Sequence, residues 1–478
     1  MSIDTQINDA FEPIASKAIN VILYSVEIGG VDIKIILVWL MAAALFFTFY
    51  LGFINIRMFK HAIEVVRGKH DNNEKAKGQI TRFQALSASL SATVGLGNIG
   101  GVAVAVSIGG PGAVPWMILM GLFSMSTKFA EVMLAVKFRE HHQTEEHPRR
   151  ISGGPMYYLK KAFKHHNIPY VGSVVAVVFA ICCIGASIGG GNMYQANQAY
   201  EQLANVSGGI LDGKAWLFGF ALAVSVGVVI IGGIKSIASV ASRLVPVMGV
   251  IYLTIGLIVI AIHYANIPEA FGIMFREAFA PEAGFGGLMG ALLVGVQRAS
   301  FSNEAGLGSA AIVHSTAKTD DAVSQGFVGM LGPFIDTVVI CTVTALVIVI
   351  SGVYQDVDGL QGVELTSKAL ASGVSWFPYV LALTVLLFAY STMITWSYYG
   401  LKAVTFLFGS KEWIELAFKL FFCMCIIVGA SAELGSIIDF SDAMLLSMAF
   451  PNIIGLYLFA PMIRRDVKEY ILRLKAKS

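Results

Sequence analysis

The sequence predicts an all-α polytopic membrane protein with eleven transmembrane helices, in which one additional N-terminal helix precedes two inverted repeats of five helices. Hydrophobic residues make up 56% and charged residues only 13% of the 478 residues, whereas an average soluble domain is roughly 25% charged. The apolar residues come in long blocks, and basic residues gather in alternate connections between those blocks. A soluble chain of this length would need a far more polar surface.

The apolar blocks are about 20 residues long, which is the length that spans the hydrocarbon core of a bilayer. Residues 1–32 lack the basic region of a signal peptide. They form an extracytoplasmic segment in which 13–30 are expected to make a short interfacial helix. Residues 463–478 form a basic cytoplasmic tail. The eleven predicted spans are 33–56, which is the additional helix, and 83–109, 113–136, 170–200, 215–233, 244–264, 285–312, 327–351, 376–401, 412–432 and 440–462.

Lysine and arginine residues set the predicted orientation. One side of the membrane receives 25 of the 33 Lys and Arg residues, whereas five lie on the opposite side and three inside spans. By the positive-inside rule the N-terminus lies outside and the C-terminus in the cytoplasm, which we expect in the inner membrane of a bacterium. The connections are too short for a soluble domain and carry no Walker motif. A primary ATP-driven pump on this chain alone is therefore not expected; the energy would come from an ion gradient or from a partner, or the transport would be passive.

Two of the predicted spans are interrupted by glycines and polar residues, at 91–101 and at 300–309. Glycine inside a helix costs about 1 kcal/mol relative to alanine, and unwound backbone at membrane depth is tolerated only where it is buried in protein or lines a cavity. There, free carbonyls bind a cation and the start of a half-helix attracts a carboxylate. Paired interruptions of this kind indicate a transporter binding site. Close helix packing alone does not explain polar residues beside the glycines in both places.

The two interrupted spans are five spans apart and run in opposite directions. The core therefore divides into a first repeat at 83–264 and a second repeat at 285–462. We expect transport by alternating access, in which spans 2, 3, 7 and 8 rock against spans 4, 5, 9 and 10 around a central site.

Several motifs together resemble the alanine or glycine:cation symporter family over residues 35–465. They are TVGLGN at 93–98, GGPG at 109–112, GGPMYY at 153–158, SNEAGLGSA at 302–310 and WSYYG at 396–400. The resemblance implies a fold similar to that of the bacterial leucine transporter. It also implies sodium-coupled uptake of small neutral amino acids, with no organic cofactor, no nucleic acid and a monomer in the lipid bilayer. Leu96 departs from the family, because many members carry Thr there.

A small zwitterionic substrate needs hydrogen-bond donors for its carboxylate and a tight apolar wall. The backbone amides of 96–98, at the start of a half-helix, are the predicted carboxylate donors. The resemblance adds Gln195, with a helix–helix hydrogen bond as the alternative, and Trp396 as a wall, with an interfacial anchor as the alternative. Phe301 is either a second wall or ordinary packing. The predicted substrate-binding residues are Thr93, Leu96, Gly97, Asn98, Gln195, Phe301, Asn303 and Trp396.

Sodium prefers hard oxygen ligands, as Ca²⁺ and Mg²⁺ do. By analogy with the wider fold, one site joins the carbonyls of Ser91, Val94 and Phe388 to the hydroxyls of Ser391 and Thr392, although such hydroxyls usually bond back to their own helix. A second site would use Asn98, the carbonyl of Thr93 and Asn303. The predicted sodium ligands are Ser91, Thr93, Val94, Asn98, Phe388, Ser391 and Thr392.

Three ionisable residues inside predicted spans, Arg298, Glu304 and Asp336, are candidates for gating or coupling. Glu304 is expected to pair with Arg298 or to hold a gate, and Asp336 to join a cation site or to lock two helices. A structural ion pair is the alternative for each. The sequence leaves open a proton-coupled or broader-specificity transporter and, as a different class, a channel; no enzyme motif is present.

Overall fold

The structure is a computed structural model that describes residue 13 and residues 24–69, 77–142, 150–279, 284–355 and 362–476. Helices dominate the described residues. In the first half of the chain they are α2 (Ile35–Tyr50), α3 (Ile54–Arg57), α4 (Phe59–Val66), α5 (Arg82–Thr93), α6 (Leu96–Gly109), α7 (Ala113–Lys137), α8 (Pro155–His165), α9 (Pro169–Ile188), η1 (Gly189–Met193), α10 (Tyr194–Val206), α11 (Ala215–Ile231) and α12 (Gly233–Ile262). In the second half they are η2 (Tyr264–Asn266), α13 (Ile267–Phe279), α14 (Gly284–Asn303), α15 (Ser309–His314), α16 (Ala322–Pro333), η3 (Phe334–Cys341), α17 (Thr342–Ile350), η4 (Val353–Gln355), α18 (Val363–Ala371), α19 (Phe377–Phe408), α20 (Glu412–Ser431), α21 (Leu434–Ser447) and α22 (Ala449–Lys475).

Within the described part of the chain, eight helical stretches are long and apolar enough to cross a membrane. Two further apolar helices, α2 and α11, are shorter. Several of these stretches combine two or more helical segments. For example, α9 continues through the π-helix η1 into α10, and α16 continues through the π-helix η3 into α17. Single π-turns inside α-helices occur frequently at functional sites.

Both predicted helix interruptions are confirmed. The helix α5 ends at Thr93, Gly95 is extended with φ −158°, and α6 begins at Leu96. The second gap is longer: α14 ends at Asn303 and α15 begins at Ser309. Three residues of this gap have left-handed backbone, Glu304 with φ 55°, Gly306 with φ 87° and Gly308 with φ 82°. Glycine adopts this conformation without the steric cost that a side chain brings.

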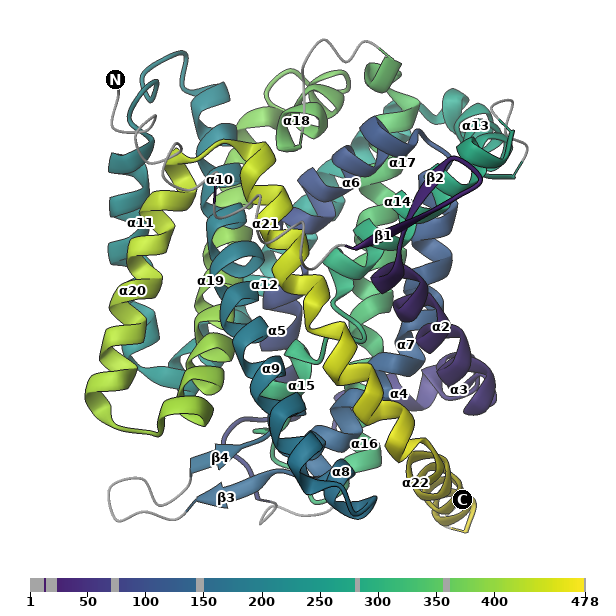
Figure 1. Cartoon of the computed structure of the whole chain (residues 1–478). Helices are drawn as coiled ribbons and strands as arrows, with labels where there is room; N and C mark the ends of the chain where they lie inside the picture. Colours follow the sequence, from purple (N-terminus) through teal and green to yellow (C-terminus); the bar gives the residue numbers. More distant parts are fainter. Residues whose placement is uncertain are drawn as a thin grey trace.

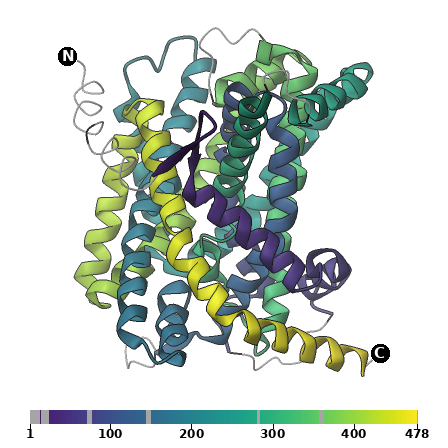
Figure 2. The same cartoon turned by 45° about the vertical axis from the view of Figure 1, so that its right-hand side comes forward.

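The two broken helices lie in the middle of the molecule, where α7, α16 and α19 surround them (Figure 1). The helices α9, α10, α11 and α20 form the neighbouring group on one side, and α2 packs on α7 and α22 on the other. Figures 1 and 2 both show α22 running obliquely across the molecule to the lower end, where its last turns point away from the body. This arrangement buries the interrupted segments under helices from distant parts of the chain.

Two small hairpins are a correction to the all-helical prediction. The strands β1 (Ser25–Ile28) and β2 (Val31–Lys34) pair antiparallel, as do β3 (Glu140–His142) and β4 (Arg150–Ser152). The first hairpin turns at Gly29 and Gly30, which have φ 63° and φ 79°, the backbone that a two-residue hairpin turn requires. The expected interfacial helix at 13–30 is therefore wrong for residues 25–28, and residues 14–23 lie outside the described residues.

Besides α4 and α8, two further helices, α13 and α18, occupy connections for which we predicted no helix. Figure 1 shows both at the end of the molecule opposite the C-terminus. The helix α18 packs against α6, and α13 packs against α7 and α17. They cover the ends of α6 and α17 and add to the enclosure of the central segments.

Candidate functional site

The side chain of Asn98 holds the first helix interruption in shape. Its Oδ1 accepts a hydrogen bond of 2.7 Å from the amide of Gly95, three residues earlier. A carboxamide three residues into a helix reaches back to the amide before the first turn, as in other helix N-terminal caps. The amide of Asn98, one of the three predicted carboxylate donors, instead donates to the carbonyl of Gly95 at 3.1 Å. The first two amides of α6 have no intrahelical acceptor, so the start of α6 presents the N–H groups of Leu96 and Gly97.

Six oxygen-bearing groups from α5 and α19 gather at the end of α5. The hydroxyl of Thr392 donates to the carbonyl oxygen of Ser91 at 2.9 Å, and the hydroxyl of Ser391 donates to the carbonyl of Phe388 at 3.0 Å. The hydroxyl of Ser91 in turn donates to the carbonyl of Ser391 at 2.5 Å. These residues are at most 1% exposed, as is Val94, which ends the helix. A buried set of carbonyl and hydroxyl oxygens fits a hard cation such as sodium.

Thr93 is the member of the predicted set whose hydroxyl turns away from this cluster. Its Oγ1 donates back to the carbonyl of Ser89 at 3.3 Å within the same helix, as Ser and Thr side chains in helices often do. The hydroxyl of Thr93 is therefore bonded within α5 and takes no part in the contacts between α5 and α19 described above.

Trp396 and Phe301 are buried aromatic residues beside the glycines of η1, and Phe301 also lies next to the first turn of α6. Trp396 is 1% exposed and lies directly over Gly191, where a methyl group would collide with the indole ring. The ring of Phe301 lies 3.4 Å from the place where a side chain on Gly97 would begin, and it meets the ring of Tyr194 edge-on with centroids 5.3 Å apart. The prediction that Trp396 could instead anchor at the membrane surface is wrong, because the side chain is buried in the centre.

Gln195 points an unpartnered oxygen toward the first interruption. Its Nε2 donates to the carbonyl of Gly190 at 2.9 Å, while its Oε1 is buried with no hydrogen-bond partner. This oxygen lies 3.4 Å from the position that a side chain on Gly95 would occupy. A buried amide oxygen without a donor is costly, so it is available to a donor that a ligand brings.

A second polar cluster joins the two interruptions through Asp336 on η3. Asn98 donates to the hydroxyl of Ser302 at 3.0 Å, and Ser302 donates to Oδ1 of Asp336 at 2.5 Å. Thr337 also donates to Oδ1 of Asp336, at 2.9 Å, and accepts from Asn303 at 3.0 Å. The second oxygen of Asp336 is buried and has no hydrogen-bond partner. The cluster brings together three predicted residues, Asn98, Asn303 and Asp336, with Ser302 and Thr337, which the sequence analysis did not single out.

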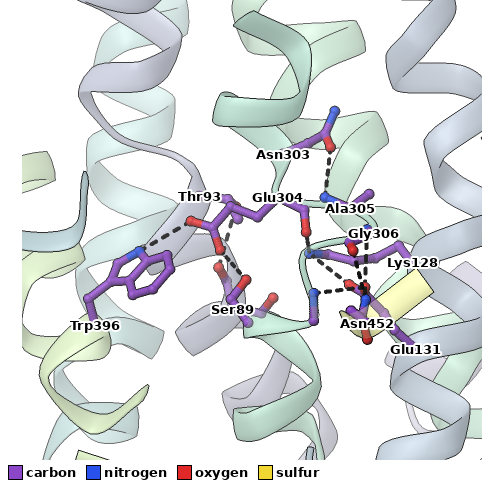
Figure 3. A network of polar contacts seen from close by, with 12 residues as sticks. Ser89, Thr93, Lys128, Glu131, Asn303, Glu304, Ala305, Gly306, Trp396 and Asn452 are labelled. Carbon is purple, nitrogen blue, oxygen red and sulfur yellow. Dashed lines mark hydrogen bonds and ion pairs between the residues drawn. The ribbon is translucent and has the colours of Figure 1, made fainter. Parts of the chain in front are cut away.

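The second interruption is held by residues of other helices (Figure 3). Oε2 of Glu131, on α7, accepts from the amides of Gly306 and Gly308, both at 3.1 Å. Asn452, on α22, donates to the carbonyl of Gly306 at 2.8 Å and to Glu131 at 3.1 Å. Lys128 lies 3.3 Å from Glu131 and donates to the carbonyl of Glu304. The pair of Lys128 and Glu131 is thus fully buried and bonded to the interruption.

The predicted pairing of Glu304 with Arg298 is wrong. The carboxylate of Glu304 accepts from the indole nitrogen of Trp396 at 3.2 Å and from the hydroxyl of Ser309. Arg298 instead forms a buried ion pair with Asp442 on α21. Residues six apart on a helix do not share a face, and Glu304 also lies beyond the end of α14, so the two side chains point in different directions.

Arg298 covers the apolar wall from one end of the molecule. Its guanidinium carbon lies 5.4 Å from the ring centroid of Phe301, within cation–π distance. Asp442 also accepts from Gln297 at 2.6 Å, and Lys34 donates to Gln297 at 3.0 Å. A short chain of polar contacts between α14, α21 and β2 therefore closes this end.

Arg139 ties together several segments at the opposite end, after α7. Its guanidinium donates four hydrogen bonds of 2.6 to 3.0 Å to backbone carbonyl oxygens. The acceptors belong to Lys77, Ser315, Ala317 and Thr319. Burial lowers the pKa of the Arg139 guanidinium from its ordinary value, while the charge of Asp320 acts in the opposite direction. Arg139 therefore holds the segment 315–319 against Lys77 at this end of the molecule.

Sequence reasoning missed Asp442, Asn452 and the connection of Glu131 to the interruption. Asp442 and Asn452 are polar residues inside a predicted span, a signal that could have identified both. The spacing of Lys128 and Glu131 predicted their ion pair but gave no information about the backbone they bind, because that backbone is 175 residues away in the chain.

The helix bundle and the two interrupted helices at its centre together indicate the class of protein. A bundle of membrane-length helices encloses two interrupted helices whose freed backbone and buried oxygens face one another, which is the construction of a secondary membrane transporter.

Comparison with known proteins identifies the family. Residues 17–478 match the model of the sodium:alanine symporter family, and the chain belongs to that family. It is 39% identical over 437 residues to the sodium/alanine symporter AgcS of Methanococcus maripaludis, covering 91% of this chain and 93% of that protein. It is 33% identical over 445 residues to the probable sodium/glutamine symporter GlnT of Bacillus subtilis, covering 93% and 89%.

A solved structure supports the fold. The chain is similar to MhsT in complex with L-phenylalanine, with a TM-score of 0.52 and 16% identity over 80% of this chain and 89% of that one. The fold is therefore of the leucine-transporter type, as the family resemblance implied. The protein is a multi-pass membrane protein and an amino acid:cation symporter.

Proposed function

We propose that this protein is a sodium-coupled symporter that imports small neutral amino acids, alanine or glycine, by alternating access. One observation carries the proposal: the buried oxygen cluster of Ser91, Ser391 and Thr392 joins the end of α5 to α19, one helical turn before the buried Trp396. A cation bound between α5 and α19 would hold a half-helix that contributes to the substrate site. Sodium affinity and substrate affinity would then rise together, because linkage between two sites is reciprocal.

In the proposed sodium site the carbonyls of Ser91, Val94 and Phe388 and the hydroxyls of Ser391 and Thr392 are the ligands. The hydroxyls that donate to the carbonyls of Ser91 and Phe388 would turn their lone pairs toward the ion. The carbonyl oxygens, which now accept hydrogen bonds from these hydroxyls, would then contact the positively charged sodium ion.

In the proposed substrate site the amides of Leu96 and Gly97 bind the carboxylate, because the start of α6 carries free N–H groups and the positive end of the helix dipole. The unpartnered Oε1 of Gln195 accepts from the substrate ammonium. Trp396 and Phe301 limit the side chain to a small group. Leu96, the first residue of α6, has no hydroxyl group that could bond to a polar substrate side chain. This favours a substrate with an apolar side chain.

The cluster around Asp336 is a second candidate cation site. Its buried carboxylate oxygen without a partner would accept a sodium ion or a proton, with Asn98, Ser302 and Asn303 nearby. This oxygen is the specific observation that favours proton coupling as the second candidate function. A broader substrate range is the other alternative, since the chain is also similar to a probable sodium/glutamine symporter.

The proposed membrane topology has eleven spans. Residues 1–32 lie outside, 33–56 form the additional helix, and 463–478 lie in the cytoplasm. The two repeats are 83–264 and 285–462, and both take part in the proposed transport cycle. The pair of Arg298 and Asp442 would close the outer end and Arg139 the cytoplasmic end. Glu304 accepts a hydrogen bond from Trp396, so a movement of the Trp396 ring would be passed on to the second interruption. The protein is proposed to work as a monomer in the inner membrane of a bacterium.

Sodium coupling is tested by uptake of radiolabelled alanine into proteoliposomes with an imposed sodium or proton gradient. We expect uptake to follow the sodium gradient, and the Thr392→Val variant to need at least about tenfold more sodium for the same rate, since it loses one oxygen ligand. Thr384→Val is the matched control, because Thr384 is equally buried on α19 but bonds only to its own helix at 2.7 Å. Uptake that follows the proton gradient and ignores sodium would favour the second candidate function.

Substrate size is tested by competition with a panel of glycine, alanine, glutamine and phenylalanine. Trp396→Leu is expected to raise the relative affinity for glutamine, because it replaces the buried ring that is proposed to limit the size of the substrate side chain. Trp376→Leu is the control, since Trp376 is 57% exposed on the surface. An unchanged preference in Trp396→Leu would remove Trp396 from the substrate site.

A further inference from the structure

A groove of about 370 Å³ separates the end of α2 from the last turns of α22. It lies at the lower end of the molecule, where α22 leaves the body next to α3 (Figures 1 and 2). Its lining includes Phe49 and Tyr50 near the end of α2, Arg57 at the end of α3, and Arg464, Lys468 and Leu472 on α22. No part of the candidate transport site contributes to this groove.

The lining is basic on one side. Arg57, Arg464 and Lys468 are exposed, and no acidic side chain is among the described residues that line the groove. Residues four apart share one face of a helix, so Arg464 and Lys468 lie one above the other along α22 and Leu472 follows on the same face.

The acidic residues of this part of α22 are bonded elsewhere. Asp466 pairs with Lys137 and with Arg465 at 3.2 Å, and Glu469 lies 3.9 Å from Arg465. The acidic side chains in these turns of α22 are therefore paired with basic side chains outside the groove. The basic side chains that line the groove have no acidic side chain among the described lining residues, so this face stays positively charged.

The remaining lining is apolar and open to the surroundings of the protein. Phe49 is 61% and Leu472 is 66% exposed, whereas Leu51 and Val467 are buried beneath them. The guanidinium carbon of Arg464 lies 4.8 Å from the ring centroid of Tyr50, which places a cation and an aromatic ring together at the mouth. Basic side chains above an apolar floor match the boundary between lipid headgroups and acyl chains.

We propose that this groove binds an anionic phospholipid. The phosphate would lie on Arg57, Arg464 and Lys468, since arginine and lysine side chains bind phosphate by charge-assisted hydrogen bonds. An acyl chain would follow Phe49, Leu51 and Leu472. The groove is on the side where the sequence places most Lys and Arg residues, and basic pockets between membrane helices on that side suit anionic headgroups. The site does not depend on sodium or amino-acid binding.

The test is native mass spectrometry of the full-length protein released from nanodiscs that contain equal amounts of phosphatidylglycerol and phosphatidylcholine. We expect the protein to retain phosphatidylglycerol in preference to phosphatidylcholine. The triple variant Arg57→Gln, Arg464→Gln, Lys468→Gln is expected to retain at least about tenfold less phosphatidylglycerol. The matched control is Lys60→Gln, Lys164→Gln, Arg465→Gln, which removes three exposed cations outside the groove and should retain phosphatidylglycerol as the unaltered protein does.

Circular dichroism and size-exclusion profiles establish that both triple variants are folded. Equal retention in the two triple variants would overturn the proposal. A second arm adds millimolar glycerol 3-phosphate, which has the headgroup chemistry without acyl chains. Displacement of phosphatidylglycerol by this soluble phosphate would also overturn the lipid site, because the apolar half of the groove would then contribute nothing.

Discussion

The first helix interruption, between α5 and α6, is short and is capped from within its own helix. Asn98 reaches back three residues to the amide of Gly95, and the adjoining oxygens of Ser91 meet α19. The second interruption, between α14 and α15, spans 304–308 and is held from outside, by Glu131 on α7 and Asn452 on α22. The first therefore keeps the backbone groups at the start of α6 available to a ligand, whereas the second has several of its backbone groups already bonded to the protein. This difference agrees with the proposal that the first interruption binds the substrate carboxylate, while the second is mainly fixed in place by the residues around it.

The largest expected effect is a loss of stability in Glu131→Ala, because Glu131 holds the second interruption in place. The substitution leaves Lys128 buried without its partner and removes the acceptor of two amides, so it should destabilise the protein by about 3–5 kcal/mol. Equilibrium unfolding in mixed micelles measures this free energy. The control is Glu412→Ala, which removes an exposed carboxylate of α20. If both variants unfolded alike, the second interruption would not depend on Glu131.

The next largest effect is expected at the first interruption, in Asn98→Ala. The variant leaves the Gly95 amide without its acceptor and Ser302 without a donor, which should cost about 1–3 kcal/mol. Asn98→Asp keeps an acceptor for Gly95 but loses the donated hydrogen bonds. Hydrogen exchange of the peptide that covers 94–98 should rise in Asn98→Ala and stay low in Asn98→Asp. Equal exchange in the two variants would contradict capping by Asn98.

A smaller effect is expected in Gly308→Ala. Gly308 has φ 82°, and a left-handed backbone costs a residue with a side chain about 1–2 kcal/mol. The added methyl group also meets the side chains of Pro155 and Asn452. The midpoint of thermal unfolding should therefore fall, with transport falling only as the folded fraction does. A selective loss of alanine affinity in this folded variant would mean that the second interruption also binds substrate.

The smallest effect on stability is expected in Gly97→Ala. Gly97 lies inside α6, and a methyl group there would make an ordinary contact with Phe301 at 3.4 Å. Alanine favours helix by about 1 kcal/mol over glycine, so the free energy of unfolding should change by less than about 1 kcal/mol. Alanine transport should nonetheless fall, because the methyl group narrows the space beside the α6 amides. Unchanged transport would place the substrate elsewhere.

The positions of both interruptions were predictable because glycine and polar residues act on the backbone around them. The partners of the interruptions were less predictable. Glu304 is a predicted partner of Arg298, whereas in the structure Arg298 pairs with Asp442, 144 residues away. The hairpin of β1 and β2 was also missed, although Gly29 and Gly30 between alternating apolar residues are a recognisable turn signal.

The sequence by itself determined the membrane class, the two places where helix gives way, and the residue types gathered there. These follow from apolar length, charge placement and the backbone freedom of glycine, which are local properties. Only the tertiary structure decided which helices hold each interruption, as when Asn452 meets Glu131 across 321 residues. A buried polar group must bond to whatever packing brings within reach, and that neighbour can come from any part of the chain.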